Sequence, residues 1–261
     1  MKRPHQSADA YGYTNVATHP ARHSARTVVK LLMESLSIRS VLDVGSGVGI
    51  WLEQFINCGV EDICGIDGAW VPTSSLLIPE TRFVVHDLTK PFNLNRMFDL
   101  VLCLEVAEHL PAEAADCLVD SITAHGSTVC FSAAIPGQGG YEHINEQYQD
   151  YWIGKFMTRA FKAFDAVRPK LWNDPSIEYY YAQNTLIFST CDLPFPTEFI
   201  PSPVHPALYS QRKDPMNYSL SQILAHLPHY VRRVVSARLK RARQDARRTR
   251  RGNRICEGPE D

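Results

Sequence analysis

The chain has 261 residues, of which 44% are hydrophobic and 21% are charged, so a sizeable core can form and a disordered chain, a collagen or a small disulfide scaffold is excluded. Its net charge of −1 conceals an asymmetry, because residues 1–231 hold 16 basic against 24 acidic residues, whereas residues 232–254 hold 11 basic and one acidic. The seven cysteines form no CxxC pair, and the sequence contains neither a long apolar run typical of a membrane span nor the apolar region of a secretory signal. These three features together predict a cytoplasmic protein with reduced thiols.

Short apolar runs alternate with helical segments over the first 135 residues. Apolar residues at helical spacing predict a helix over 24–36, and the segments 51–59 and 112–124, which lie between apolar runs, are also predicted to be helical. Strands are predicted over 41–45, 63–68, 82–88, 98–105 and 127–136. The strands are continuous apolar runs, as expected where helices cover both faces of a sheet. This order therefore predicts an α/β fold with a doubly wound parallel sheet.

The pattern changes after Pro136. A polar, glycine-rich and aromatic segment comes first, and two final strands are predicted over 164–172 and 177–190, joined by a turn. The six prolines within 191–218 predict a linker without regular structure. Residues 219–261 are predicted to form a basic helical tail, in which arginines surround one apolar stripe. The alternative is a solvated extension that docks on the acidic part of the same chain.

The motif with the greatest chemical content is DVGSGVG at 43–49, between the first strand and the next helix. Glycines here permit a tight turn and the close approach of a ligand to the backbone. Dinucleotide folds use G-x-G-x-x-G, but position 50 is Ile50 and an acid, Asp43, precedes the first glycine. Asp43 suits a ligand with a cationic amino-acid end.

Acidic residues also follow the next three predicted strands. Asp67 ends the second strand, where a carboxylate can accept both hydrogen bonds of a ribose diol. Asp87 follows the third strand and could accept an adenine amino group, although an ordinary turn is the alternative. Glu105 ends the fourth strand, within LEVAEHL. Ligands of open parallel sheets bind beyond the carboxyl ends of the strands, so these positions predict one crevice.

Four of these segments resemble the motifs of class I S-adenosylmethionine-dependent methyltransferases: VLDVGSGVG, GIDG, HDL and FDLVLCLEVAEHL. The resemblance implies a Rossmann-like sheet of seven strands, with the last strand antiparallel and inserted between the fifth and sixth. It also implies that the cofactor is S-adenosylmethionine. The cofactor-binding residues that it implies are Asp43, Gly45, Ser46, Gly47, Asp67, Gly68, Asp87, Leu88 and Glu105.

A narrower resemblance covers about residues 10–190. Six blocks in order are similar to a bacterial methyltransferase-domain family often found near sugar- and polysaccharide-modifying genes: HSARTVV, VLDVGSGVGIWL, LEVAEHL, FSAAIPGQGGxxHxNEQ, RPxxW and YYYAQN. The expected organisation is a methyltransferase domain over 1–190, a proline-rich linker over 191–218 and the basic tail over 219–261.

Two histidines are candidates for catalysis. Methyl transfer is an in-line displacement, and an oxygen nucleophile needs help to lose its proton, for which histidine is the usual base near neutral pH. We prefer His143, in the loop after the fifth strand, to His109, which we expect at the start of a helix over the cofactor. The alternative is that His143 only orders its loop. No metal site is predicted.

These observations favour a methyltransferase that acts on a small molecule or glycan, at oxygen. The first alternative is an RNA- or protein-directed methyltransferase that uses the basic tail, since residues 232–254 could contact nucleic acid, a membrane surface or an acidic partner. The second is a methyltransferase-like binding protein that has lost catalysis. A nicotinamide oxidoreductase is disfavoured by Asp43 and by the absence of the third glycine.

Overall fold

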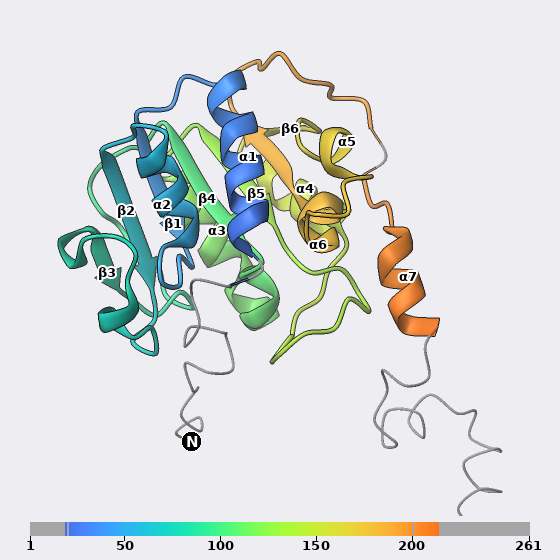
Figure 1. Cartoon of the computed structure of the whole chain (residues 1–261), viewed down its shortest axis with the longest axis horizontal. Helices are drawn as coiled ribbons and strands as arrows, with labels where there is room; N and C mark the ends of the chain where they lie inside the picture. The colour runs from blue at the N-terminus through green and yellow to red at the C-terminus, as the bar shows by residue number, and fades with distance from the viewer. Residues whose placement is uncertain (1–18, 20, 200, 214–261) are drawn as a thin grey trace, which may run out of the picture. The chain divides into compact units, whose positions relative to one another are not determined.

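The computed structural model describes residue 19 and the ranges 21–199 and 201–213. The chain divides into two compact units, residues 1–208 and 209–261. The first unit is an α/β fold (Figure 1). The predicted basic helix over 219–261, with its candidate contact region 232–254, lies outside the described residues.

A seven-stranded sheet in the order β3-β2-β1-β4-β5-β7-β6 forms the centre of this unit. Its strands are β1 (Ser40–Val44), β2 (Asp62–Asp67), β3 (Phe83–Val85), β4 (Leu100–Leu104), β5 (Thr128–Ser132), β6 (Lys162–Phe164) and β7 (Leu186–Ser189). Neighbours from β3 to β5 pair in parallel, whereas β7 is antiparallel to both β5 and β6. The doubly wound sheet with an antiparallel last strand between the fifth and sixth is therefore confirmed.

Helices cover both faces of the sheet. They are α1 (Ala21–Ser35), α2 (Ile50–Asn57), α3 (Ala115–Thr123), α4 (Gln149–Met157), α5 (Arg168–Leu171) and α6 (Tyr179–Asn184). A further helix, α7 (Pro206–Lys213), spans the boundary between the two units. One apolar core lies between the sheet and α1, α2, α5 and α6, and a second lies between the sheet and α3 and α4. In Figure 1, α1 and α2 stand in front of the strands and α3 lies behind them. All five residues of β4 are buried, which explains its continuous apolar sequence.

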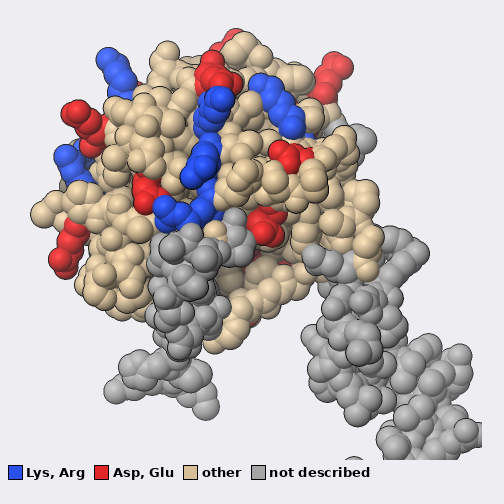
Figure 2. Space-filling model, in the orientation of Figure 1, with Lys and Arg blue, Asp and Glu red and all other residues tan. Residues whose placement is uncertain are grey.

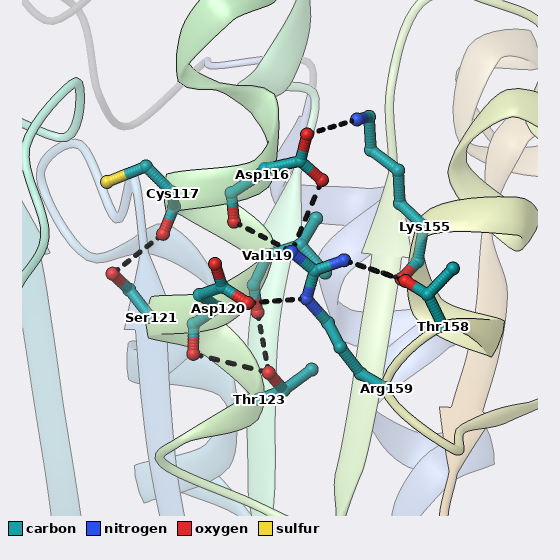
Figure 3. A network of polar contacts seen from close by, with 9 residues as sticks. All are labelled: Asp116, Cys117, Val119, Asp120, Ser121, Thr123, Lys155, Thr158 and Arg159. Carbon is teal, nitrogen blue, oxygen red and sulfur yellow. Dashed lines mark hydrogen bonds and ion pairs between the residues drawn. The ribbon is translucent and has the colours of Figure 1, made fainter.

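Ion pairs join α3 to α4 on the outside of the second core (Figure 3). Arg159 donates through Nε to Asp120 Oδ1 at 2.6 Å and through a terminal nitrogen to Asp116 Oδ1 at 3.2 Å. Lys155 Nζ donates to Asp116 Oδ2 at 2.9 Å. The aspartates are largely exposed, so each pair stabilises the fold only modestly, but together they position α4, which follows the long loop after β5.

The region after Pro136 differs from the prediction. The expected strand over 164–172 ends at Phe164, and α5 follows, because Pro169 cannot donate to a ladder and suits the first turn of a helix. The expected strand over 177–190 is α6 followed by the short β7. Helix α4 was not predicted, because its polar and aromatic sequence has no clear period.

The proline-rich segment also contains a helix, α7, contrary to the prediction for 191–218. Pro206 is its first residue, where a missing backbone N–H removes no helical hydrogen bond. Within the described ranges, none of the helices combines the length and apolar character that crossing a bilayer requires. Figure 2 shows acidic and basic side chains interspersed over α1 and α2, where Arg22 pairs with Glu53 at 2.5 Å.

Candidate functional site

The turn from β1 to α2 is the glycine-rich motif of the sequence. Gly45, Gly47 and Gly49 have φ values of 81°, 52° and 88°. Residues other than glycine rarely adopt this left-handed backbone conformation. A Cβ atom on Gly45 would lie 2.3 Å from Val106 Cγ2, so the turn passes directly against the residue that follows β4 and Glu105. Position 45 therefore requires glycine for two reasons: its φ is left-handed, and the Val106 side chain fills the space that a Cβ would need.

Asp43 lies under this turn with an incompletely satisfied carboxylate. Its side chain is 2% exposed, and Oδ2 has no hydrogen-bond partner among the described residues. Burial, and then the nearby Asp67 carboxylate, raise the pKa of Asp43 to about 8. A buried carboxylate without a partner is costly, and a cationic ligand group next to it would remove that cost.

Asp67, the last residue of β2, holds the glycine turn. Its Oδ2 accepts a hydrogen bond from Gly47 N at 2.7 Å, and its Oδ1 accepts one from Gly68 N at 2.6 Å. Burial raises the pKa of Asp67 to about 6, against the lowering effect of these two hydrogen bonds. The ring of Trp70 lies 2.1 Å from where a Cβ of Gly68 would be, so the ring covers the backbone of Gly68 and a larger residue there would displace it.

Three other residues expected at the cofactor have different surroundings. Asp87 is exposed and caps its own turn, accepting from Thr89 N at 3.0 Å and Thr89 Oγ1 at 2.7 Å, which lowers its pKa. Leu88 is 2% exposed and its side chain belongs to the second core, which leaves only its backbone for a ligand. Ser46 is buried at 6% exposure within the glycine turn.

Glu105 joins three segments at the end of β4. Its carboxylate accepts hydrogen bonds from Gln138 Nε2 at 2.8 Å, in the loop after β5, and from Asn184 Nδ2 at 3.0 Å, at the end of α6. Burial raises the pKa of Glu105, and these hydrogen bonds oppose the rise. Gln183 and Asn184, from the YYYAQN block, are therefore buried polar residues that tie α6 to the site.

His143 and His109 come together although 34 positions separate them, their ring centroids being 4.8 Å apart in an edge-to-face arrangement. His143 Nδ1 lies 3.1 Å from Glu146 Oε1, and the side chain of His143 is only 11% exposed. A Cβ on Gly140 would lie 2.2 Å from His143 Nε2. Both predicted catalytic residues thus lie in one cluster, with a glycine that makes room for the ring of His143.

His109 is not at the start of an α-helix, as expected, but ends the 3-10 turn η5 (Ala107–His109). Pro111 follows two residues later and starts a new turn, which prevents the expected helix from reaching back to His109. Burial, and then His143, lower the pKa of His109 to about 4. His109 is therefore neutral near pH 7.

Backbone hydrogen bonds hold the loop after β5 against this turn. Ile144 N and Asn145 N both donate to the carbonyl oxygen of Glu108, at 2.9 and 3.0 Å. Glu146 also accepts hydrogen bonds from Gly137 N at 2.6 Å and from Gly139 N at 2.7 Å, which close the loop on itself. His143 is therefore carried by a tightly folded loop, which extends beyond the sheet in Figure 1.

Sequence reasoning missed Glu108. Its side chain is fully buried, and neither carboxylate oxygen has a hydrogen-bond partner among the described residues. Burial, and then the neighbouring Glu105, raise its pKa well above the ordinary value for glutamate. One ligand atom from each of Glu108, His109 and His143 can be chosen so that all three lie within 4.8 Å of one another. The spacing Glu105-x-x-Glu108-His109 was the available sequence indication.

Comparisons with known proteins agree with this fold. Residues 16–125 match a family model described as a methyltransferase domain. No curated protein sequence is similar enough to count as a match. The fold is similar to the methyltransferase domain of bacterial CtHen1-C, with 16% identity, a TM-score of 0.50, and coverage of 67% of this chain and all of that one. It is also similar to DesVI of Streptomyces venezuelae, with 14% identity and a TM-score of 0.53. The similarity covers 73% of this chain and all of DesVI. The Rossmann-like fold expected from the sequence is therefore confirmed, and these two methyltransferase structures share it.

Proposed function

We propose that this protein is an S-adenosylmethionine-dependent methyltransferase that acts on a hydroxyl group of a small molecule or glycan. The observation that carries the proposal is Asp43, whose Oδ2 atom is buried beside the glycine turn without a partner. The amino-acid end of S-adenosylmethionine supplies a cationic amine, which would give this carboxylate the partner it lacks.

The other residues at the strand ends fit the same cofactor. Gly45 and Gly47 present bare backbone in the turn, and Asp67 keeps that turn in place while its carboxylate remains at the end of β2 for a ribose diol. Asp87, exposed after β3, is the expected partner of the adenine amino group. The cofactor supplies an activated methyl group, and the protein has to orient the acceptor and take up its proton.

His143 is the better of the two candidates for that proton. Glu146 contacts its Nδ1 and so fixes the ring, which leaves Nε2 to accept a proton from an acceptor hydroxyl. Burial makes His109 a weaker base, because its pKa is lowered to about 4. We therefore assign the proton transfer to His143 and treat His109 as its neighbour.

We place part of a hydroxylated acceptor in a cavity next to α6, although none of the candidate cofactor or catalytic residues lines it. Its volume is about 500 Å³, and its walls include Trp172, Tyr179 and His205. Aromatic rings stack on sugar faces, and a site of this size is within the range of small-molecule pockets. Helix α6 lines the cavity at its first residue and contacts Glu105 at its last, a span of roughly 9 Å for six residues.

The test is release of S-adenosylhomocysteine from a panel of acceptors: saccharides, hydroxylated small molecules, amines, an RNA and a protein. Turnover on hydroxylated small molecules or saccharides that survives removal of residues 214–261 is expected. Turnover only on RNA or protein, lost on that removal, would establish the alternative that depends on the basic tail. Binding of the cofactor without turnover on any acceptor would favour a binding protein.

A further inference from the structure

We propose that Glu108, His109 and His143 together bind a divalent cation of the first transition series. The use that we give to the cation, binding of the acceptor hydroxyl, rests on the proposed function. The binding itself does not, and it can be measured without cofactor or acceptor.

The geometry brings three ligand types together from two segments. Glu108 and His109 come from the turn after β4, and His143 comes from the loop after β5, which two backbone hydrogen bonds hold on the carbonyl of Glu108. Their candidate ligand atoms lie within 4.8 Å of one another. Ligand atoms about 2.0–2.2 Å from one cation are about 3–3.5 Å apart, so side-chain rotations that move these atoms by about 1 Å complete the site.

The burial of Glu108 is the second, independent observation. A carboxyl group that is fully buried without a basic partner is rare, because little compensates for its desolvation. The neighbouring Glu105 differs, since Gln138 and Asn184 already donate to its two oxygens. Glu108 is therefore the carboxylate available to a cation, and Glu105 lies outside the ligand set.

The donor set indicates the class of cation. Two imidazoles with one carboxylate suit first-row dications such as Zn²⁺, Co²⁺ or Mn²⁺, and three protein ligands leave coordination positions open. An acceptor hydroxyl in an open position would have a lowered pKa and could lose its proton to water. Its oxygen would then form the C–O bond while the C–S bond breaks and the electron pair stays on sulfur. When the cation is bound, His143 is a ligand and water takes the proton of the acceptor; the general-base role proposed above for His143 applies to the cation-free protein.

The experiment is titration of the untagged, metal-stripped full-length protein with Co²⁺ alone, followed by visible absorption and calorimetry. One bound Co²⁺ per chain is expected, with the absorption bands of nitrogen and oxygen ligation. Glu108→Gln, His109→Gln and His143→Gln should each weaken binding by more than about 100-fold, since loss of an outer-shell partner alone costs 10- to 100-fold. Glu113→Gln and His86→Gln, the same changes outside the cluster, should bind as the wild type does.

The proposal is overturned if the wild type binds no Co²⁺ at millimolar concentration, or if Glu108→Gln binds as tightly as the wild type. Circular dichroism identifies any variant that has unfolded, and for such a variant the two remaining changes decide. Calorimetry with S-adenosylmethionine on the same metal-stripped samples keeps the two claims apart. If the protein binds S-adenosylmethionine but not Co²⁺, only the cation site is refuted. If it binds Co²⁺ but not S-adenosylmethionine, only the proposed cofactor is refuted.

Discussion

The carboxylate of Asp67, at the end of β2, accepts a hydrogen bond from the backbone N–H of Gly47 at 2.7 Å, in the turn after β1. The same carboxylate accepts a second one from Gly68 N at 2.6 Å. A residue selected in the sequence as a ribose ligand therefore also holds the glycine turn in shape. Its replacement should affect both the fold and the binding of the cofactor.

Asp67→Ala should weaken binding of S-adenosylmethionine by about 1.5–3 kcal/mol, the scale of hydrogen bonds to a charged group. It should also reduce the free energy of unfolding by about 1–3 kcal/mol, because two buried backbone N–H groups lose their acceptor. Calorimetry and urea unfolding measure the two effects. Asp87→Ala is the comparison for stability alone, since Asp87 is exposed and bonds only within its own turn; it should cost less stability than Asp67→Ala. Affinity within twofold of the wild type in Asp67→Ala would limit Asp67 to a structural role.

Asp43→Asn should change how the stability of the ligand-free protein depends on pH. The pKa of Asp43 is about 8 in the folded protein and about 4 in an unfolded chain, so between these values the folded state holds a proton that the unfolded state has lost. Stability therefore falls as pH rises through this window, by up to about 1.4 kcal/mol per pH unit from this group. The asparagine variant lacks this contribution. Urea unfolding between pH 5 and 8 should show that the free energy of unfolding falls less steeply with pH in the variant than in the wild type. Parallel curves would mean that Asp43 is already ionised at pH 5 in the free protein.

His143→Ala should leave the affinity for S-adenosylmethionine nearly unchanged and reduce turnover by about 10²–10⁴, the usual contribution of a general base. Single-turnover kinetics with a hydroxylated acceptor measures the loss, with His86→Ala as the control. Equal turnover in His143→Ala and wild type would remove His143 from the mechanism. A large loss in His109→Ala alone would transfer the base to the turn after β4. Comparable losses in both variants are the result expected if the two histidines share a cation.

Gly140→Ala tests whether the position of the His143 ring matters. The added Cβ would meet His143 Nε2 at 2.2 Å, whereas nothing lies within 4 Å of the Cβ position of Gly139. Both glycines have positive φ, at 156° and 70°, so both substitutions strain the backbone, but only the first displaces the imidazole. Turnover should fall by about 100-fold in Gly140→Ala and much less in Gly139→Ala. Similar losses in the two variants would attribute the effect to loop strain alone.

The first 135 residues could be predicted well because each buried parallel strand is a continuous apolar run and each strand end carries a distinct motif. The region after Pro136 could not, because α5 and α6 are short and the tyrosines of α6 fit a strand equally well. Trp51 and Tyr181, for example, pack edge to face at 5.1 Å, a contact that no local pattern reveals. Apolar periodicity identifies long elements and fails for helices of four to six residues.

The candidate site, like the fold, could be predicted where its residues lie next to a strand and not where they depend on the loop after β5. Asp43, the glycine turn and Asp67 could be found because each lies next to its own strand in the sequence. Glu108 could not, because what distinguishes it is the absence of a partner for its buried oxygens, which depends on the loop after β5 folding over it. The contact between His109 and His143 likewise depends on that loop.

The central claim is most directly tested by calorimetric titration of the folded full-length protein with S-adenosylmethionine and with S-adenosylhomocysteine. Both ligands carry the amine expected beside Asp43 and the ribose expected at Asp67, so both should bind with one site per chain. Asp43→Asn should weaken both by a similar factor, because the amine is common to them. If the wild type, shown to be folded by circular dichroism, binds neither ligand at millimolar concentration, the assignment of the site as a methyltransferase cofactor site is wrong.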